Sequence, residues 1–123
     1  MRQHESFKIA QGEYQQVSFT VSEDSGTALD LTTCTSIDWV IWDGSADVEV
    51  LRREKADGTI SGAQSDIIEF ELYSTETSDL DPGTYLHQLT VTLPGVVGTG
   101  EQTKVVAQGH LRVLDSVEVQ GVG

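Results

Sequence analysis

One stretch decides the fold, and it reads Leu80-Asp81-Pro82-Gly83-Thr84-Tyr85-Leu86-His87-Gln88-Leu89-Thr90-Val91-Thr92-Leu93. Pro82 fixes its own φ and Gly83 can adopt a positive φ, so the start of the stretch predicts a turn. Beyond the turn, side chains two residues apart share one face of an extended chain. The predominantly apolar face carries Tyr85, His87, Leu89, Val91 and Leu93. The stretch therefore predicts a half-buried strand that follows a tight turn.

The spacing from Asp81 through Gly83 to Tyr85 resembles the tyrosine corner of immunoglobulin-like sandwiches. In that motif, a tyrosine near the start of a strand turns its hydroxyl back onto upstream backbone. An ordinary turn followed by a core tyrosine is the alternative. His87 stands where antibody-type domains have the second cysteine of their bridge, and Cys34 is the single cysteine of the chain, so that bridge is absent. His87 is expected to be a neutral, hydrogen-bonded histidine of the core.

Alternating segments of the same kind recur along the chain. They predict strands at residues 6–10, 17–21, 37–43, 48–52, 68–72 and 105–113, with a helical turn at 75–79. Turn signals separate them at roughly the 8–12-residue spacing of sandwiches. The predicted fold is all-β, an immunoglobulin-like antiparallel β-sandwich of about seven to nine strands.

A single domain is the natural expectation for 123 residues. Residues 1–116 are predicted to form the sandwich, and residues 117–123 a C-terminal tail. Strand 85–93 is expected to end at Pro94-Gly95, before a glycine-rich loop that runs to residue 100. Cys34 is expected to be a small buried hydrophobe rather than a nucleophile. The predicted core contains one large side chain from each of several strands, namely Phe19, Trp39, Phe70, Leu89 and Leu111.

The chain is strongly acidic, with 7 basic and 20 acidic residues and a net charge of −13. Such a surface repels phosphate backbones, which excludes nucleic acid as a partner. No stretch approaches the ~20 apolar residues of a membrane span, and no apolar run follows Met1, so neither a membrane partner nor a Sec signal peptide is predicted. The acidity indicates a basic or neutral partner surface, or it serves only to keep the domain soluble.

Motifs that would carry chemistry are missing from the sequence. The histidines His4, His87 and His110 are far apart and show no metal-binding spacing. The aspartates are scattered without the spacing of a calcium hand, although a calcium site at the loop ends is an alternative. There is no phosphate-binding loop and no Gly-x-Ser-x-Gly elbow. The protein is therefore expected to be no enzyme, to bind no cofactor and to hold no metal.

The third predicted strand, residues 37–43, has apolar side chains on both faces. Immunoglobulin-like domains place a tryptophan of this strand in the core, so Trp39 is expected to point inward and Trp42 outward. In such domains this strand lies in one sheet with the strands at 85–93 and 105–113. The outward residues of the three strands form the predicted interface, which contains Val40, Trp42, Leu86, Gln88, Val106 and Gln108.

A tryptophan within an apolar patch is typical of protein interaction sites. An intermolecular interface is therefore the favoured interpretation of this face. The alternative is that a long loop or the tail folds over it.

Taken in order, the motifs resemble those of a family of small bacteriophage virion proteins with an immunoglobulin-like fold. The matching segments are Phe7-Lys8-Ile9-Ala10-Gln11-Gly12-Glu13, Val17-Ser18-Phe19-Thr20-Val21, Leu29-Asp30-Leu31-Thr32, Ile37 to Ile41, Leu80-Asp81-Pro82-Gly83-Thr84-Tyr85 and Gly109-His110-Leu111-Arg112-Val113. They span nearly the full length. Thr33 and His87 depart from the family, which often has a glycine and an aromatic residue at these places.

The resemblance implies a non-enzymatic structural protein of a virion, made in the host cytoplasm without a signal peptide. A small acidic domain without a fibre segment suits a capsid decoration (cement) protein best, with neck, tail or baseplate proteins as alternatives. Its partners would be other phage structural proteins (capsid, neck or tail) or a further copy of this chain. A carbohydrate-binding or adhesive module is less favoured. Such a module would show two or three aromatic side chains on one solvent face, and Trp42 is the one aromatic side chain of this chain that is clearly expected on such a face.

Overall fold

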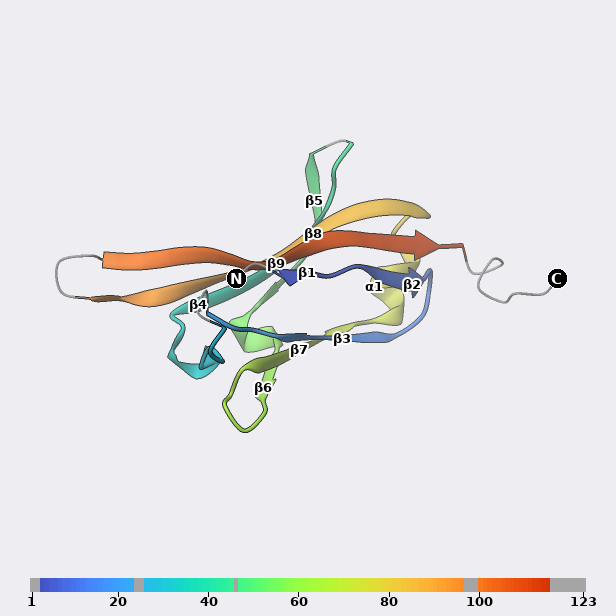
Figure 1. Cartoon of the computed structure of the whole chain (residues 1–123). Helices are drawn as coiled ribbons and strands as arrows, with labels where there is room; N and C mark the ends of the chain where they lie inside the picture. Colours follow the sequence, from blue (N-terminus) through green and yellow to red (C-terminus); the bar gives the residue numbers. More distant parts are fainter. Residues whose placement is uncertain (1–2, 24–25, 46, 97–99, 116–123) are drawn as a thin grey trace.

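The computed structural model describes residues 3–23, 26–45, 47–96 and 100–115, which form nine strands in two sheets (Figure 1). The larger sheet has the strand order β1-β9-β8-β4-β5, and β2 also pairs with β9. Its strands are β1 (Gln3–His4), β2 (Phe7–Ala10), β4 (Ser36–Asp43), β5 (Val48–Glu54), β8 (Gly83–Val96) and β9 (Gly100–Leu114). The smaller sheet has the order β3-β7-β6, with β3 (Gln15–Thr20), β6 (Thr59–Ser61) and β7 (Ile67–Leu72).

The two sheets pack face to face as an all-β, immunoglobulin-like sandwich, which confirms the predicted fold class. The first strand segments, β1 and β2, pair in parallel with β9 rather than with β3. In the described part of the chain, three short helical segments connect the strands: η1 (Leu31–Thr33), η2 (Lys55–Asp57) and α1 (Ser74–Ser78). The predicted tail at 117–123 lies outside the described residues.

Aromatic side chains from three strands meet at the centre of the sandwich. The ring centroids of Trp39 lie 5.4 Å from those of Phe19 and Phe70, spacings at which aromatic pairs attract one another beyond simple burial. Leu89 and Leu111 close the core from the larger sheet, and all five predicted core residues are at most 1% exposed. Cys34 is buried as expected, and burial raises the pKa of its thiol.

His87 connects the core to the N-terminal segment through two hydrogen bonds. The indole Nε1–H of Trp39 donates to His87 Nδ1 at 3.2 Å, and His87 Nε2 lies 2.6 Å from the carbonyl oxygen of Glu5. An indole nitrogen can only donate and a carbonyl can only accept, so His87 is the neutral tautomer protonated at Nε2. This arrangement agrees with the predicted neutral core histidine.

Gly109 lets the Glu5 backbone approach the sheet. A Cβ at position 109 would lie 1.8 Å from the Glu5 carbonyl oxygen, a distance that no real contact allows. Glu5 also donates its N–H to the Gln108 carbonyl at 2.9 Å. The glycine therefore allows the N-terminal segment to lie directly against β9, where it covers His87.

The tyrosine corner is present at the start of β8. The Tyr85 hydroxyl donates to the Asp81 carbonyl oxygen at 2.8 Å, and the side chain is buried. Gly83 has a φ of 153°, in the region that favours glycine, and open space surrounds the place of its missing Cβ. Residues Asp81, Gly83 and Tyr85 thus take the positions predicted for them.

The expected end of the strand at Pro94-Gly95 is wrong, because β8 continues to Val96. Pro94 has no N–H for the ladder, and the pairing with β9 shifts its register between Leu93 and Val96. An irregularity of this kind accommodates a proline without ending the strand. As a result the β8–β9 hairpin extends beyond the strands of the smaller sheet in Figure 1. Residues 97–99 of the expected loop lie outside the described residues.

The prediction that Val106 lies on the outer face is also wrong, because Val106 is in the core at 6% exposure. Leu89 pairs with Ala107 and the next residue, Thr90, pairs with Val105, so β9 contains one extra residue between the two pairs. Such a bulge reverses the alternation of side chains on one side of it. Val106 consequently points inward beside Ala107.

We expect Tyr85→Phe to lower the free energy of unfolding by about 1 kcal/mol, the net contribution of one intramolecular hydrogen bond. The loss would be somewhat larger because the Asp81 carbonyl is left without its donor. Urea denaturation at equilibrium measures the change. A midpoint and slope identical to those of the unsubstituted protein would show that the corner contributes nothing to stability.

Candidate functional site

The outer face of β4, β8 and β9 has an apolar row at one end. The strand register places Trp42 opposite Leu86, and Leu86 opposite His110. Trp42 and Leu86 are half-buried and His110 is exposed. His110 is a member that the predicted interface omitted, although the alternation along β9 places it on the same face as Gln108.

The next row contains Val40 on β4, Gln88 on β8 and Gln108 on β9, again directly opposite one another. All three side chains are half-buried. Five of the six predicted interface residues therefore share this face, and only Val106 does not. Apolar surface and two amides are thus combined within two adjacent rows, as the sequence predicted.

An open depression of about 220 Å³ lies between these rows. Its lining consists of Trp42, Leu86, His87, Gln88, Gln108, Gly109 and His110. Ligand pockets for small molecules have volumes of roughly 300–1,000 Å³ and enclose most of the ligand. A smaller, open hollow is better suited to receive one or two side chains of another protein.

Charged residues of β4 and β5 border the depression on one side. Arg52 donates to Glu49 at 2.9 Å and to Asp38 at 3.2 Å. The hydrogen bond from Arg52 holds the pKa of Glu49 below its ordinary value. Arg52 lies opposite Val40 and Glu49 lies opposite Trp42, so these ion pairs continue the two rows outward. A half-buried apolar centre with a charged rim is the usual anatomy of a protein interface.

The β4–β5 turn bounds the depression beside Leu86. A Cβ on Gly44 would lie 2.8 Å from Leu86 Cδ1, so only a residue without a side chain fits there unless Leu86 moves. Asp43 Oδ1 accepts from the backbone N–H of Ser45 at 3.0 Å and from its hydroxyl at 2.6 Å, which fixes the start of the turn. In Figure 1 this hairpin projects from the sandwich.

A second cluster lies on the opposite, outer face of the smaller sheet, and no sequence argument predicted it. Tyr14 and Tyr73 are 46% and 50% exposed, and their ring centroids are 6.2 Å apart. Both hydroxyls donate to the Glu71 carboxylate, Tyr14 at 2.6 Å and Tyr73 at 2.9 Å. The pairing of β3 with β7 brings the two tyrosines together: Gln15 opposes Leu72, and the same register carried one residue further places Tyr14 opposite Tyr73.

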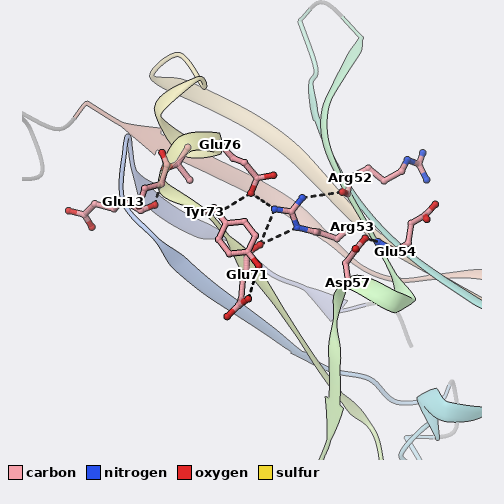
Figure 2. Close-up of polar contacts among 10 residues, drawn as sticks. Glu13, Arg52, Arg53, Glu54, Asp57, Glu71, Tyr73 and Glu76 are labelled. Atoms are coloured by element: carbon pink, nitrogen blue, oxygen red, sulfur yellow. Dashed lines mark hydrogen bonds and ion pairs between the residues drawn. The ribbon is translucent and has the colours of Figure 1, made fainter.

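Figure 2 shows Arg53 beside this cluster. Its guanidinium donates to the Glu71 carbonyl oxygen at 3.0 and 3.1 Å and forms an ion pair with Glu76. The guanidinium carbon lies 5.9 Å from the Tyr73 ring centroid, within the range of a cation–π interaction. Glu76 also accepts the backbone N–H of Tyr73 at 3.0 Å, which holds the start of α1 in place.

Neither face shows a metal centre. Within residues 3–23, 26–45, 47–96 and 100–115, no group of three or more His, Cys, Asp or Glu side chains could hold a metal ion. Over the same part of the chain, no helix is sufficiently long and apolar to span a bilayer.

The tyrosine–glutamate cluster should titrate abnormally. Hydrogen bonds from the two hydroxyls lower the pKa of Glu71, and the same bonds raise the pKa of Tyr14 and of Tyr73 above 10.0. These hydrogen bonds stabilise the fold at pH values between the lowered pKa of Glu71 and the raised pKa values of the two tyrosines. The stabilisation is lost as the pH falls through the carboxyl pKa or rises through the phenol pKa values.

Glu71→Gln should therefore move the ionisation of Tyr14 and Tyr73 back toward pH 10, which an NMR titration of the tyrosine rings measures. Tyr85 is the internal control, because burial is the main cause of its raised pKa, and its titration should be unchanged. Unaltered titration of Tyr14 and Tyr73 would show that the hydrogen bonds to Glu71 are absent in solution.

Comparisons with known proteins identify no family. No protein-family model matches the chain, and no curated protein matches it. Among solved structures, it is similar to AggA, the major subunit of aggregative adherence fimbriae type I from Escherichia coli. That similarity has 11% sequence identity, covers 88% of this chain and 89% of the other, and has a TM-score of 0.41.

Proposed function

We propose that this chain is a non-enzymatic structural protein of a bacteriophage virion, and specifically a capsid decoration protein. It would attach through the outer face of β4, β8 and β9. The phage assignment is supported by the resemblance of its motifs to small virion proteins. The observation that carries the attachment face is the open depression that the half-buried Trp42, opposite Leu86, lines together with Gln88 and Gln108.

Three features of this face favour a protein partner. Tryptophan is enriched among the residues that dominate binding free energy. The two glutamines offer amide donors and acceptors at the centre of the patch, and the Arg52 ion pairs form a charged rim. The volume of about 220 Å³ suits an inserted side chain better than a metabolite.

The net charge of −13 adds a constraint on the partner surface. An acidic domain associates fastest with a basic surface, and the association rate falls as salt screens the attraction. A capsid lattice with basic residues at the attachment point meets this requirement. A neck, tail or baseplate position is the alternative location, and the same outer face would serve there.

A carbohydrate-binding module is less favoured by the geometry. Among the described residues, the aromatic side chains that are more than a third exposed are Tyr14 and Tyr73. Their ring planes are tilted by 42° to one another, so the pair does not form one flat platform for a sugar ring. Trp42, the aromatic residue that the sequence placed on a solvent face, is half-buried and lies on the other side of the sandwich.

The decisive experiment adds purified protein to phage particles that lack it and measures bound copies per particle. Trp42→Ala should remain folded and bind about thirtyfold more weakly, since truncation of a central tryptophan commonly costs about 2 kcal/mol. Trp39→Ala is the core control and should unfold, because loss of a buried aromatic side chain costs roughly 3–5 kcal/mol. Ser18→Ala, exposed on β3, is the surface control and should bind normally.

Full occupancy by a folded Trp42→Ala protein would show that the attachment face lies elsewhere. Failure of the unsubstituted protein to bind any site on the particle would exclude the virion role itself. Decoration of the neck or tail, seen by electron microscopy, would replace the capsid assignment with the alternative location.

A further inference from the structure

The cluster of Tyr14, Glu71 and Tyr73 has a composition that attachment through Trp42 does not explain. It lies on the outer face of the smaller sheet, and the Trp42 face is the outer face of the larger sheet. About half of the surface of each tyrosine residue is open to solvent. Exposed aromatic rings of this size add apolar surface that a monomer does not need for folding, which indicates an interaction site.

The electrostatics of this cluster are those of a cation site. Glu71 carries its charge at neutral pH as an ordinary glutamate does, and the two phenol hydroxyls that donate to its carboxylate lower its pKa further. The faces of the two tyrosine rings carry the negative part of the aromatic quadrupole. A carboxylate and two ring faces thus lie within one small area of a protein whose net charge is −13.

Arg53 provides an example, within the same protein, of a guanidinium group that lies over the ring of Tyr73. Its guanidinium lies 5.9 Å from the Tyr73 ring centroid while it donates to the Glu71 carbonyl and pairs with Glu76. Arg53 is fixed there by its bonds to β7 and α1 and is largely buried, with 12% of its side chain exposed. Tyr14, by contrast, is 46% exposed, and its ring is tilted toward Tyr73 at a centroid distance of 6.2 Å.

We propose that the Tyr14–Glu71–Tyr73 cluster binds an arginine side chain of a second protein. The guanidinium would contact the tyrosine ring faces and pair with the Glu71 carboxylate, as cation–π and charge-assisted hydrogen bonds require. Charge complementarity selects this occupant over a sugar, whose rings need a flat aromatic platform and gain nothing from the excess negative charge. Because this site and the Trp42 face point away from each other, the domain can link two proteins.

The test uses the full chain, isotope-labelled, with N-acetyl-L-arginine methylamide as the probe and NMR shifts of Tyr14 and Tyr73 as the readout. The uncharged analogue N-acetyl-L-citrulline methylamide is the matched probe for charge, and methyl β-D-glucopyranoside is the probe for a sugar. A single side chain should bind with a dissociation constant on the order of 1 mM. The citrulline analogue should bind at least about tenfold more weakly.

Substitutions within the cluster test whether the arginine probe binds there. Glu71→Gln removes the charge, and Tyr73→Leu removes one ring; each should weaken the arginine response at least about fivefold. Glu69→Gln is the matched control, because Glu69 lies on the same strand and face two residues away, while both tyrosine hydroxyls donate to Glu71. It should leave the response unchanged, as should Trp42→Ala, which separates this proposal from the attachment face.

Equal binding of the arginine and citrulline probes would overturn the proposal, as would the lack of a saturable response to arginine. Loss of the response in Glu69→Gln as well as in Glu71→Gln would show diffuse charge attraction rather than a site. Saturable binding of the glucoside at lower concentration than the arginine probe would assign the cluster to a carbohydrate instead.

Discussion

A chain of two hydrogen bonds, from Trp39 through His87 to the backbone of Glu5, joins the core of this sandwich to its N-terminal segment. The Trp39 and His87 side chains are buried and the bond to Glu5 is part-buried, and a buried polar group left without its partner costs roughly 1–3 kcal/mol. The chain joins three segments far apart in the sequence: β4, β8 and the N-terminal segment on β9. Gly109 makes the last link possible by leaving room for the Glu5 carbonyl. His87 thus stands where antibody domains have the second cysteine of an inter-sheet bridge, but its two bonds link elements of the larger sheet to one another.

The inward position of Trp39 and His87 determines which side chains of β4 and β8 lie on the outer face of the larger sheet. With Trp39 held against His87 in the core, the alternation along β4 turns Val40 and Trp42 toward the other side of the sheet. The same alternation along β8 places Leu86 and Gln88 beside them. His87 and Gly109 also line the depression around Trp42, so the residues that anchor the N-terminal segment form part of the proposed attachment face.

Local patterns in the sequence predicted most of the sandwich, because alternation and turn chemistry depend on neighbouring residues. Three features were predicted in this way: the corner at Asp81–Tyr85, the inward Trp39, and the placement of five of the six residues of the predicted interface on one outer face. Val106 was assigned to the wrong face because a bulge depends on pairing between β8 and β9, which no single strand reveals. The Tyr14–Glu71–Tyr73 cluster was missed for the same reason, since its members meet only when β3 and β7 are aligned. Similarly, the partner of His87 could not be predicted, because Glu5 contributes a backbone carbonyl rather than a side chain.

The most direct measurement of the central constraint is the protonation state of His87 in solution. A long-range ¹H–¹⁵N spectrum of the histidine rings distinguishes a protonated ring nitrogen from an unprotonated one. The structure predicts a neutral His87 that carries its proton on Nε2 at neutral pH, together with a Trp39 indole proton that exchanges as slowly as the core amides. A proton on Nδ1, or on both ring nitrogens, would contradict the account, because Nδ1 could not then accept from Trp39 and the link between β4, β8 and Glu5 would not exist as described.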